Sequence, residues 1–334
     1  MKIKKILVNL LAVVLAVAIL DAFCWWFYNP VAYVHDDVRA TDTVRVPNTF
    51  NSRAKEGFAW HMTDANGYNN AEVPGEDGVF VLMMGSSQLE GFNVMLEENA
   101  ASRLQVNLME NGVEGFVYNI GMSNHMLTRN IANMDRALTH YAPTGYLVLE
   151  THDLSIGSSS IENAINDSYR RISATEVPLP DFLAERPLLR ALYRQFMSML
   201  EGEEASNYQE LKPEYVAQYR ADIQRLMQHV ADVAGSHGVT PILYYHPHLM
   251  VQADGTARPQ TDPNCLAAYA DACAATGVVF VDLTQDFMDA YEDAYVLPHG
   301  FANTAPGTGH LNEEGCRMIA EKLCDTILKL EAEK

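Results

Sequence analysis

The chain has 334 residues, of which 43 are Asp or Glu and 23 are Lys or Arg, so its formal net charge at pH 7 is −20. A surface this acidic repels nucleic acid and anionic lipid, which argues against a nucleic-acid partner. The part that follows the N-terminal segment, about 300 residues, is large for a minimal domain. It contains no convincing repeat or low-complexity stretch.

The N-terminal segment predicts a membrane anchor. Residues 1–5 are rich in lysine and precede Ile6–Tyr28, a nearly uninterrupted apolar run. A helix over this run, rising about 1.5 Å per residue, spans roughly 34 Å, which is enough for a bilayer core of about 30 Å. The lysines favour the cytoplasmic side, and Trp25, Trp26 and Tyr28 suit the far interface. We expect a cytoplasmic tail, a single-pass anchor and a cell-membrane location with the remaining chain on the extracytoplasmic side.

A cleaved signal peptide is the competing interpretation of this segment. Ala16-Val17-Ala18 has the small-x-small form of a cleavage site, but apolar and aromatic residues continue well past it. Cys24 is a poor lipoprotein site, because Asp21 and Phe23 stand where small residues are expected. The sequence favours the uncleaved anchor.

Four cysteines lie beyond the anchor, in two pairs with a spacing of eight residues on expected helices. An oxidising exterior would permit bridges between these two helices, and free buried thiols are the alternative. The sequence has no CxxC pair and no Cys/His spacing typical of a metal site, so no metal and no other cofactor is predicted. The four residues are Cys265, Cys273, Cys316 and Cys324.

The remaining chain divides into a lead-in and one domain. Residues 29–75 are polar, contain prolines and read as a membrane-proximal lead-in, and residues 76–334 form the expected domain. Residues 155–211 interrupt this domain with a Ser-rich turn, prolines, a helix near Phe182–Met199 and an acidic loop. This insertion is either a solvated helical excursion or a lid over the site.

Short apolar runs alternate with helical patterns from residue 79 onward. Runs without charge are typical of strands buried on both faces, and their alternation with helices predicts an α/β fold with a parallel sheet covered by helices. The expected strands are Val79–Met84, Phe116–Tyr118, Tyr146–Leu149, Ile242–Tyr245 and Val278–Val281, and the expected helices are Asn99–Met109, Thr128–Leu138, Glu214–Ala234 and Asp262–Ala275.

Small, hydroxyl, amide and imidazole residues follow these strands, at the edge where open α/β sheets bind ligands. Each residue alone has an ordinary explanation: Asn119 can bond a turn, His152 can fill a core, and Asn312 can cap the last helix. Their order along the chain is more informative. The motifs are VLMMGSSQ from Val81, VYNIGMSN from Val117, VLETHD from Val148, and GTGHLNEEG from Gly307.

These four motifs resemble the four sequence blocks of the SGNH/GDSL hydrolase family. The resemblance covers roughly residues 76–330, and Asn66-Gly67-Tyr68 also looks like a segment that precedes the first strand in membrane-anchored members. It implies a three-layer α/β/α fold of flavodoxin-like type, with a central, mostly parallel sheet of about five strands.

The resemblance also implies a nucleophile and a base. Ser87 falls at the nucleophile, with Ser86 replacing the usual aspartate, and His310 falls at the general base. A serine hydroxyl needs such a base at neutral pH. The family's aspartate three residues before the histidine is replaced by Gly307, so either a carbonyl or another carboxylate orients His310 or the base is weak. Asp282 and Asp286 are candidates, and both also read as helix caps.

Three donors to an oxyanion are implied as well. They are the backbone N–H of Ser87, the backbone N–H of Asn124, where glycine is usual, and the side chain of His152, where asparagine is usual. Any residue except proline supplies a backbone N–H, and a neutral imidazole can donate one hydrogen bond. Such a substituted oxyanion hole can still operate.

The resulting hypothesis is an extracytoplasmic serine esterase or O-acyltransferase acting on ester-linked acyl groups, with acetyl the expected group. The location and the family's habits indicate a small acylated molecule or a cell-surface glycan as substrate, and a membrane protein could supply the acyl group. The alternative is a catalytically inactive scaffold or binding protein of cell-envelope assembly that keeps the fold. The missing aspartate and the altered second and third motifs favour this alternative.

Overall fold

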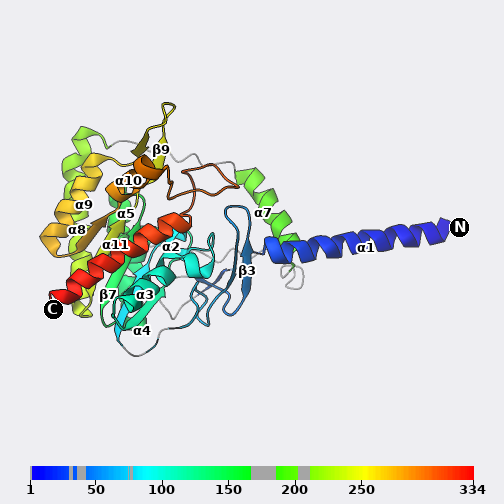
Figure 1. Cartoon of the computed structure of the whole chain (residues 1–334), viewed down its shortest axis with the longest axis horizontal. Helices are drawn as coiled ribbons and strands as arrows, with labels where there is room; N and C mark the ends of the chain where they lie inside the picture. Colours follow the sequence, from blue (N-terminus) through cyan, green and yellow to red (C-terminus); the bar gives the residue numbers. More distant parts are fainter. Residues whose placement is uncertain are drawn as a thin grey trace.

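The structure is a computed structural model of the chain (Figure 1). It describes residues 2–29, 33–35, 43–73, 75, 78–166, 186–201 and 211–334.

A five-stranded sheet forms the centre of the domain. All of its neighbouring strands pair in parallel, in the order β6-β5-β7-β8-β11, which is the 2-1-3-4-5 order of flavodoxin-like folds. The five apolar runs of the sequence are these strands, so the predicted α/β class and parallel sheet are confirmed. The strands are β5 (Val79–Met84), β6 (Gly115–Asn119), β7 (Tyr146–Thr151), β8 (Thr240–Tyr245) and β11 (Val279–Asp282).

Helices cover both faces of the sheet and make the predicted three layers. One face packs against α4 (Leu127–Tyr141), α5 (Ser158–Ile165), α8 (Val216–Ser236) and α9 (Pro263–Thr276). The other face packs against α3 (Ala100–Glu110), α10 (Thr284–Ala294) and α11 (Glu313–Ala332). Shorter elements are α2 (Ser87–Glu90), the 3-10 turns Leu96–Glu98 and Pro213–Tyr215, and a hairpin of β9 (Leu249–Val251) and β10 (Ala257–Pro259).

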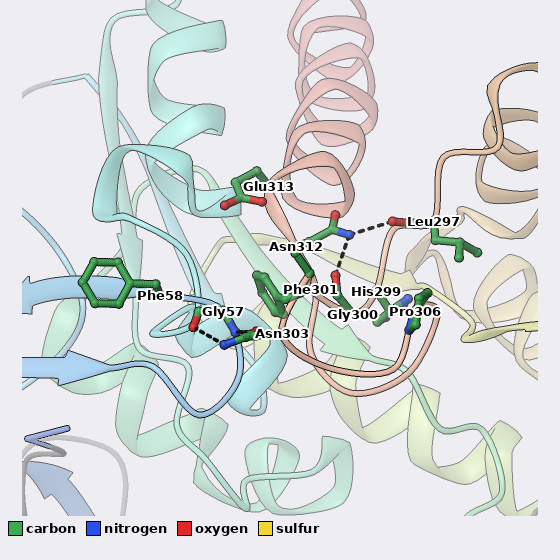
Figure 2. Close-up of a pocket in the computed structure, with 11 residues that line it drawn as sticks. Gly57, Phe58, Leu297, His299, Gly300, Phe301, Asn303, Pro306, Asn312 and Glu313 are labelled. Carbon is green, nitrogen blue, oxygen red and sulfur yellow. Dashed lines mark hydrogen bonds between the residues drawn. The ribbon is translucent and has the colours of Figure 1, made fainter. Parts of the chain in front are cut away.

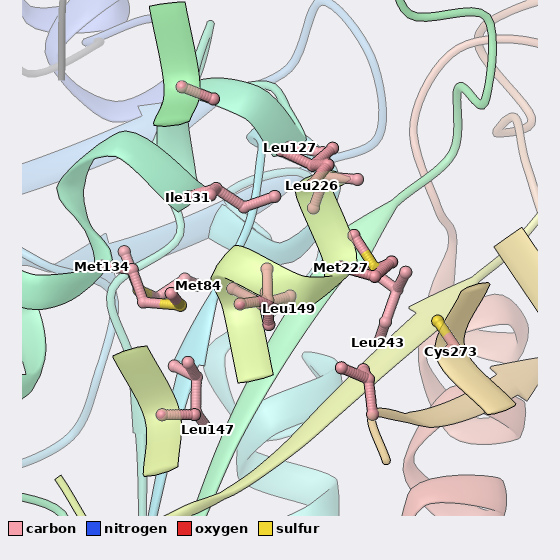
Figure 3. Close-up of a cluster of buried hydrophobic side chains, with 14 of the residues drawn as sticks. Met84, Leu127, Ile131, Met134, Leu147, Leu149, Leu226, Met227, Leu243 and Cys273 are labelled. Carbon is pink, nitrogen blue, oxygen red and sulfur yellow. The ribbon is translucent and has the colours of Figure 1, made fainter. Parts of the chain in front are cut away.

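The alternation of side chains along each strand divides the core in two. Leu82 and Met84 of β5 face the first helix layer, whereas Val81 and Met83 face the second, and all four are fully buried. Figure 3 shows the first cluster, where strand residues such as Leu149 meet side chains of the covering helices. Each buried side chain of this size contributes about 1.5–3 kcal/mol. Burial on both faces explains why the apolar runs within these strands lack charge.

The four cysteines beyond the anchor lie on opposite sides of the sheet. Cys265 and Cys273 of α9 belong to the first core cluster, and Cys316 and Cys324 of α11 belong to the second. All four are buried free thiols. Because the sheet separates the two helices, no bridge between them can form.

The N-terminal helix α1 (Lys2–Phe27) extends away from the domain (Figure 1). Its Ile3–Phe27 part, 25 residues, is long and apolar enough to cross a membrane and is not buried by the rest of the chain. A signal sequence shares these features. The helix therefore meets the predicted length and composition of an anchor.

Residues 43–73 of the lead-in are structured. They include β2 (Thr43–Arg45), which pairs with β1 (Tyr33–His35), and an antiparallel hairpin of β3 (Phe50–Arg53) and β4 (Ala59–Met62). Figure 1 shows β3 between the end of α1 and the sheet domain.

The described part of the insertion contains α5 and α7 (Pro187–Glu201), while residues 182–185 of the expected helix lie outside the described residues. Helix α7 lies beside the end of α1 (Figure 1), and the Leu188 N–H donates to Asp21 Oδ1 at 3.1 Å. A role for the insertion as a lid stays a prediction.

Candidate active site

Ser87 lies where the first strand of the sheet turns into a helix. β5 ends at Met84, and Ser87 is the first residue of α2. Ser86 caps this helix, because its Oγ accepts from the Gln88 N–H at 3.2 Å. Serine and aspartate are both good N-caps. Ser86 can therefore cap the helix in place of the aspartate that the family motif has at this position. The sheet order reverses at β5, and Ser87 therefore lies at the switch point where open sheets bind ligands.

The structure brings Ser87 and His310 together from opposite ends of the domain. His310 Nε2 lies 2.9 Å from Ser87 Oγ, within hydrogen-bond distance. His310 stands just before α11, which Asn312 caps by accepting from the N–H groups of Glu314 and Gly315 at 3.1 Å each. With its lone pair on Nε2, the imidazole can accept the serine proton.

Glu56 is the carboxylate that orients His310. Its Oε2 lies 2.6 Å from His310 Nδ1, and its Oε1 accepts from the His310 backbone N–H at 2.5 Å. The first contact fixes the tautomer with hydrogen on Nδ1, so Nε2 stays free to accept from Ser87. Ser87, His310 and Glu56 therefore form a complete triad, here called the triad.

Neither carboxylate suggested by the sequence holds His310, so that expectation was wrong. Asp282 Oδ1 accepts from the Thr284 N–H at 2.8 Å and stabilises the turn into α10. Asp286 pairs with Lys322 at 2.9 Å. Glu56 lies in the turn between β3 and β4, in a segment with no recognised motif, and no signal in the sequence pointed to it.

The charge on Glu56 suits its role. Burial opposes ionisation, but the hydrogen bond and the charge of His310 outweigh it, so the pKa of Glu56 lies below its ordinary value. The turn is held by Asn93, whose Nδ2 donates to the Glu56 carbonyl at 2.9 Å. A fixed, ionised carboxylate beside Nδ1 stabilises the imidazolium that forms when His310 takes the serine proton.

Gln88 holds the chain on both sides of His310, a role that the sequence did not reveal. Its Nε2 donates to the Gly309 carbonyl at 3.1 Å, and its Oε1 accepts from the Leu311 N–H at 2.8 Å. The imidazole of His248 also donates to the Gly309 carbonyl, at 2.9 Å from Nε2. Gln88, the residue after Ser87, thus helps to fix the distance between Ser87 and His310.

The two glycines before His310 give a matched pair of variants. Gly307 and Gly309 both adopt positive φ, at 77° and 82°. A Cβ on Gly309 would lie 2.0 Å from Glu56 Oε1, whereas a Cβ on Gly307 would lie 3.1 Å from the Leu249 carbonyl and away from Glu56. We expect Gly309→Ala to displace Glu56 and lower kcat by on the order of 10²-fold.

Gly307→Ala carries the same backbone strain, so it is the control and should keep most of the rate. Steady-state kinetics on a soluble ester, with melting curves for both variants, tests this difference. Equal losses of rate in the two variants would contradict a specific role for the Gly309–Glu56 contact.

Asn124 has the backbone conformation that its place in the motif implies. Its φ is 66°, in the left-handed region that favours glycine and that asparagine tolerates better than most residues. The loop is tied to the end of β5, because the Met122 N–H donates to the Gly85 carbonyl at 3.0 Å. The substitution of glycine by Asn124 is therefore compatible with the loop.

Glu150 connects His152 to the nucleophile turn. Glu150 Oε2 accepts from the Ser86 N–H at 2.6 Å, and Oε1 lies 2.9 Å from His152 Nδ1 and 3.1 Å from His246 Nε2. Glu150 and His246 are buried, whereas the His152 side chain is 17% exposed. A buried carboxylate thus accepts one backbone and two imidazole hydrogen bonds beside Ser87.

The surroundings change the pKa values of Glu150, His152 and His246 in different directions. Burial would raise the pKa of Glu150, but the charge and hydrogen bond of His152, with the hydrogen bond of His246, hold it well below its usual range. Burial would lower the pKa of His152, but the charge and hydrogen bond of Glu150 raise it above its ordinary value. Burial lowers the pKa of His246 despite Glu150. Relative to the free side chains, these shifts favour the ionised form of Glu150, the cationic form of His152 and the neutral form of His246.

This arrangement limits which form of His152 can donate to an oxyanion. Its Nδ1–H is occupied by Glu150, so Nε2 is the remaining nitrogen. In the neutral tautomer fixed by Glu150, Nε2 carries no hydrogen, and it becomes a donor when the ring is protonated. The sequence expectation of a neutral donor therefore changes to a cationic one.

The same group has the ligand types of a metal site. Ligand atoms of Glu150, His152 and His246 lie within 4.8 Å of one another. One carboxylate and two imidazoles suit zinc. Hydrogens on His152 Nδ1 and His246 Nε2 account for both short contacts to Glu150, so hydrogen bonds explain the arrangement of this group.

Two cavities flank the turn that carries Glu56. The larger, about 560 Å³, lies between Phe58 and the loop after His299 (Figure 2). Asn303 closes one side of it, accepting from the Gly57 N–H at 3.0 Å and donating to the Gly57 carbonyl at 3.1 Å. The smaller cavity, about 380 Å³, contains Glu56 and His310 in its wall. The smaller cavity therefore lies against two of the triad residues, Glu56 and His310.

Comparisons with known proteins returned structures and no sequence relatives. No protein-family model matches the chain, and no curated protein matches it. Matching solved structures include the psychrotrophic esterase EstA from Pseudoalteromonas sp., which is 12% identical with a TM-score of 0.41. The match covers 76% of this chain and 98% of the chain of that esterase. The lipase/acylhydrolase from Enterococcus faecalis is 14% identical with a TM-score of 0.40 and covers 75% and 95%. A provisionally assigned SGNH hydrolase from Slackia heliotrinireducens is 15% identical with a TM-score of 0.41 and covers 75% and 100%.

Proposed function

We propose that this chain is a membrane-anchored serine esterase or O-acyltransferase of SGNH type, which acts outside the cytoplasm on ester-linked acyl groups. The observation that carries the proposal is the triad, in which His310 bonds Ser87 Oγ at 2.9 Å and Glu56 at 2.6 Å. A serine at a strand end, bonded to an imidazole that a carboxylate orients, is the arrangement that activates a hydroxyl for acyl transfer.

The reaction would proceed through an acyl-enzyme. Ser87 Oγ attacks the acyl carbonyl carbon while its proton moves to His310 Nε2. The tetrahedral oxyanion is stabilised by the N–H groups of Ser87 and Asn124 and by cationic His152. The C–O bond to the leaving alcohol then breaks, and His310 gives that oxygen its proton. Water or a sugar hydroxyl then attacks the acyl carbon of the acyl-Ser87 ester and passes its proton to His310 Nε2. The bond between the acyl carbon and Ser87 Oγ breaks, and His310 returns the proton to Oγ.

The N-terminal segment is the basis for the proposed location and substrate. Lysines before an apolar helix favour an extracytoplasmic domain, where acylated small molecules and acetylated surface glycans are exposed. A membrane protein that supplies acyl groups would be a partner for the transferase form. Water and a sugar hydroxyl are equivalent nucleophiles for the triad, so hydrolysis and transfer share one site.

An inactive scaffold protein is the second candidate, and it rested on two observations. The absent aspartate before His310 no longer favours it, because Glu56 supplies a carboxylate from another segment. Asn124 and His152, which stand where glycine and asparagine are usual, still favour it.

A fluorophosphonate probe tests the proposal, because it forms a covalent bond with an activated serine. We expect labelling of the full chain in detergent or vesicles, and no labelling of Ser87→Ala. Ser86→Ala is the matched control, since it removes a helix cap worth about 1 kcal/mol and leaves Ser87 in place. A wild-type protein that is folded but unlabelled would contradict the proposed function.

A further inference from the structure

The first turn of α7 is bonded to an acidic residue inside the predicted membrane helix. The Leu188 N–H donates to Asp21 Oδ1 at 3.1 Å, and Arg186 Nη1 lies 3.8 Å from Asp21 Oδ2. Asp21 lies within the apolar run Ile6–Tyr28. Acidic residues inside membrane helices are rare and are paired with a specific partner. The first turn of α7 is the partner of Asp21.

The position of Asp21 along α1 gives the depth of this contact. Asp21 precedes Phe27, the last residue of α1, by about 9 Å along the helix axis, because each residue adds about 1.5 Å. Helices that lie in a membrane interface are buried by about 5–10 Å at the boundary between head groups and acyl chains. With Trp25 and Trp26 at the outer interface, the first turn of α7 lies at the depth of an interfacial helix.

A second polar contact holds α7 to the chain that leaves α1. Arg190 Nη2 donates to Asn29 Oδ1, and the Asn29 N–H donates to the Ser52 carbonyl of β3 at 3.1 Å. Figure 1 shows α7 beside the end of α1. Helix α7 is thus attached both to the membrane helix and to the hairpin that follows it.

Helix α7 exposes two apolar side chains beside α1. Leu192 and Phe196 lie four positions apart, which places them on one face of the helix. They are 58% and 59% exposed. Exposed apolar side chains next to a membrane helix lose their contact with water when the bilayer interface covers them.

The hairpin exposes a second apolar face beside the same end of α1. Phe58, Trp60 and Met62 alternate with buried residues, so they share one face of β4. They are 45%, 39% and 52% exposed. The Phe58 ring lies 5.8 Å from the Phe27 ring, and the Trp60 ring lies 5.8 Å from the Trp26 ring, measured between centroids. The exposed rings of β4 therefore continue the aromatic residues that mark the interface on α1.

We infer that these five side chains form a bilayer-docking surface, and that Asp21 holds α7 in it. The docking surface consists of Leu192, Phe196, Phe58, Trp60 and Met62. The bilayer is the occupant because the docking surface is continuous with the exposed apolar side chains of α1, which the same bilayer covers. The inference rests on the membrane anchor of the proposed function and adds a second contact with that membrane. It also keeps the triad near the bilayer, because Glu56 lies in the turn just before Phe58.

A fluorescent label on α7 tests the docking surface. The cysteines beyond the anchor are buried, so Leu192→Cys or Phe196→Cys in a Cys24→Ser background supplies the reactive thiol for an environment-sensitive dye. The full chain is then placed in phosphatidylcholine vesicles. The matched control is Met109→Cys, since Met109 is 61% exposed and lies on α3, away from α1 in Figure 1. Compared with this control, we expect iodide to quench the α7 labels about threefold less or weaker still, and lipids with a nitroxide near the head group to quench them more.

Asp21→Ala, combined with Phe196→Cys, removes the acceptor for the Leu188 N–H. We expect quenching by the nitroxide lipids to fall by about twofold or more, because the first turn of α7 is no longer held at this depth. Asp21→Asn keeps an oxygen that accepts from this N–H, so it should retain most of the quenching. Equal quenching in Asp21→Ala and in the unchanged chain would overturn the role of Asp21.

Two results with the α7 labels would overturn the docking surface. In the first, iodide quenches them as strongly as the Met109→Cys label, so water covers the face. In the second, neither iodide nor the nitroxide lipids reach them, so a second copy of the chain covers the face. Flotation of the full chain with the vesicles at alkaline pH separates these results from failure of the proposed function. A chain that does not float lacks the anchor, whereas a floating chain with water-exposed labels contradicts the docking surface alone.

Discussion

Glu56→Gln is expected to lower kcat by about 10⁴-fold, with a much smaller effect on KM. Glutamine keeps the size of the side chain but cannot hold His310 in the tautomer that leaves Nε2 free, and it gives the imidazolium no charge stabilisation. The comparable loss of a triad carboxylate in a serine protease is about 10⁴-fold. Steady-state kinetics on a soluble acetyl ester, with a melting curve, measures the change.

Asp282→Asn and Asp286→Asn are the matched controls for this prediction, because the sequence made both residues candidates for the same role. Asp282 bonds the backbone of its own turn and Asp286 pairs with Lys322, so both variants should keep nearly the full rate. If either control lost as much rate as Glu56→Gln, the assignment of Glu56 as the third member of the triad would be wrong.

His152→Ala is expected to lower kcat by about 10²- to 10³-fold, the cost of removing one oxyanion donor. The wild-type rate should also fall at alkaline pH. Because Glu150 raises the pKa of His152, the cationic donor is fully present below the ordinary range near pH 6.5 and is lost as pH rises through the higher folded value. A pH–rate profile between neutral and alkaline pH measures this limb.

His152→Asn separates a donor from a core residue. The amide donates at every pH, so this variant should recover part of the alanine loss and lack the alkaline limb. Glu150→Gln should move the limb to lower pH, because it removes the charge that raises the pKa of His152. If His152→Ala had the wild-type rate, His152 would not be an oxyanion donor, and its role would be packing alone.

The sequence alone determined the architecture of the sheet and two members of the triad. Buried parallel strands need apolar residues on both faces, so β5 and the Tyr146–Leu149 part of β7 are visible as uncharged runs. Ser87 and His310 each lie within a local motif next to an element whose boundary is also visible, and the ends of parallel strands meet at one edge. The resemblance of these motifs to the blocks of the SGNH/GDSL family, together with their place at the strand ends, therefore predicted that these two residues would meet.

The third member of the triad was decided by the tertiary structure. Glu56 and His310 are 254 positions apart, and Glu56 stands in a polar hairpin turn whose sequence has no periodic pattern. Periodicity reports the surroundings of a residue within its own element. It does not report which distant turn packs against it.

The tertiary structure also decided the hydrogen bonding of His152 and whether the cysteines can pair. Glu150 fixes the first, because it occupies Nδ1 from the end of the same strand, and the second depends on which face of the sheet each helix covers. Helices on opposite faces can carry identical cysteine spacings. The spacing is a property of one helix, whereas a contact is a property of two segments brought together by burial of their apolar faces.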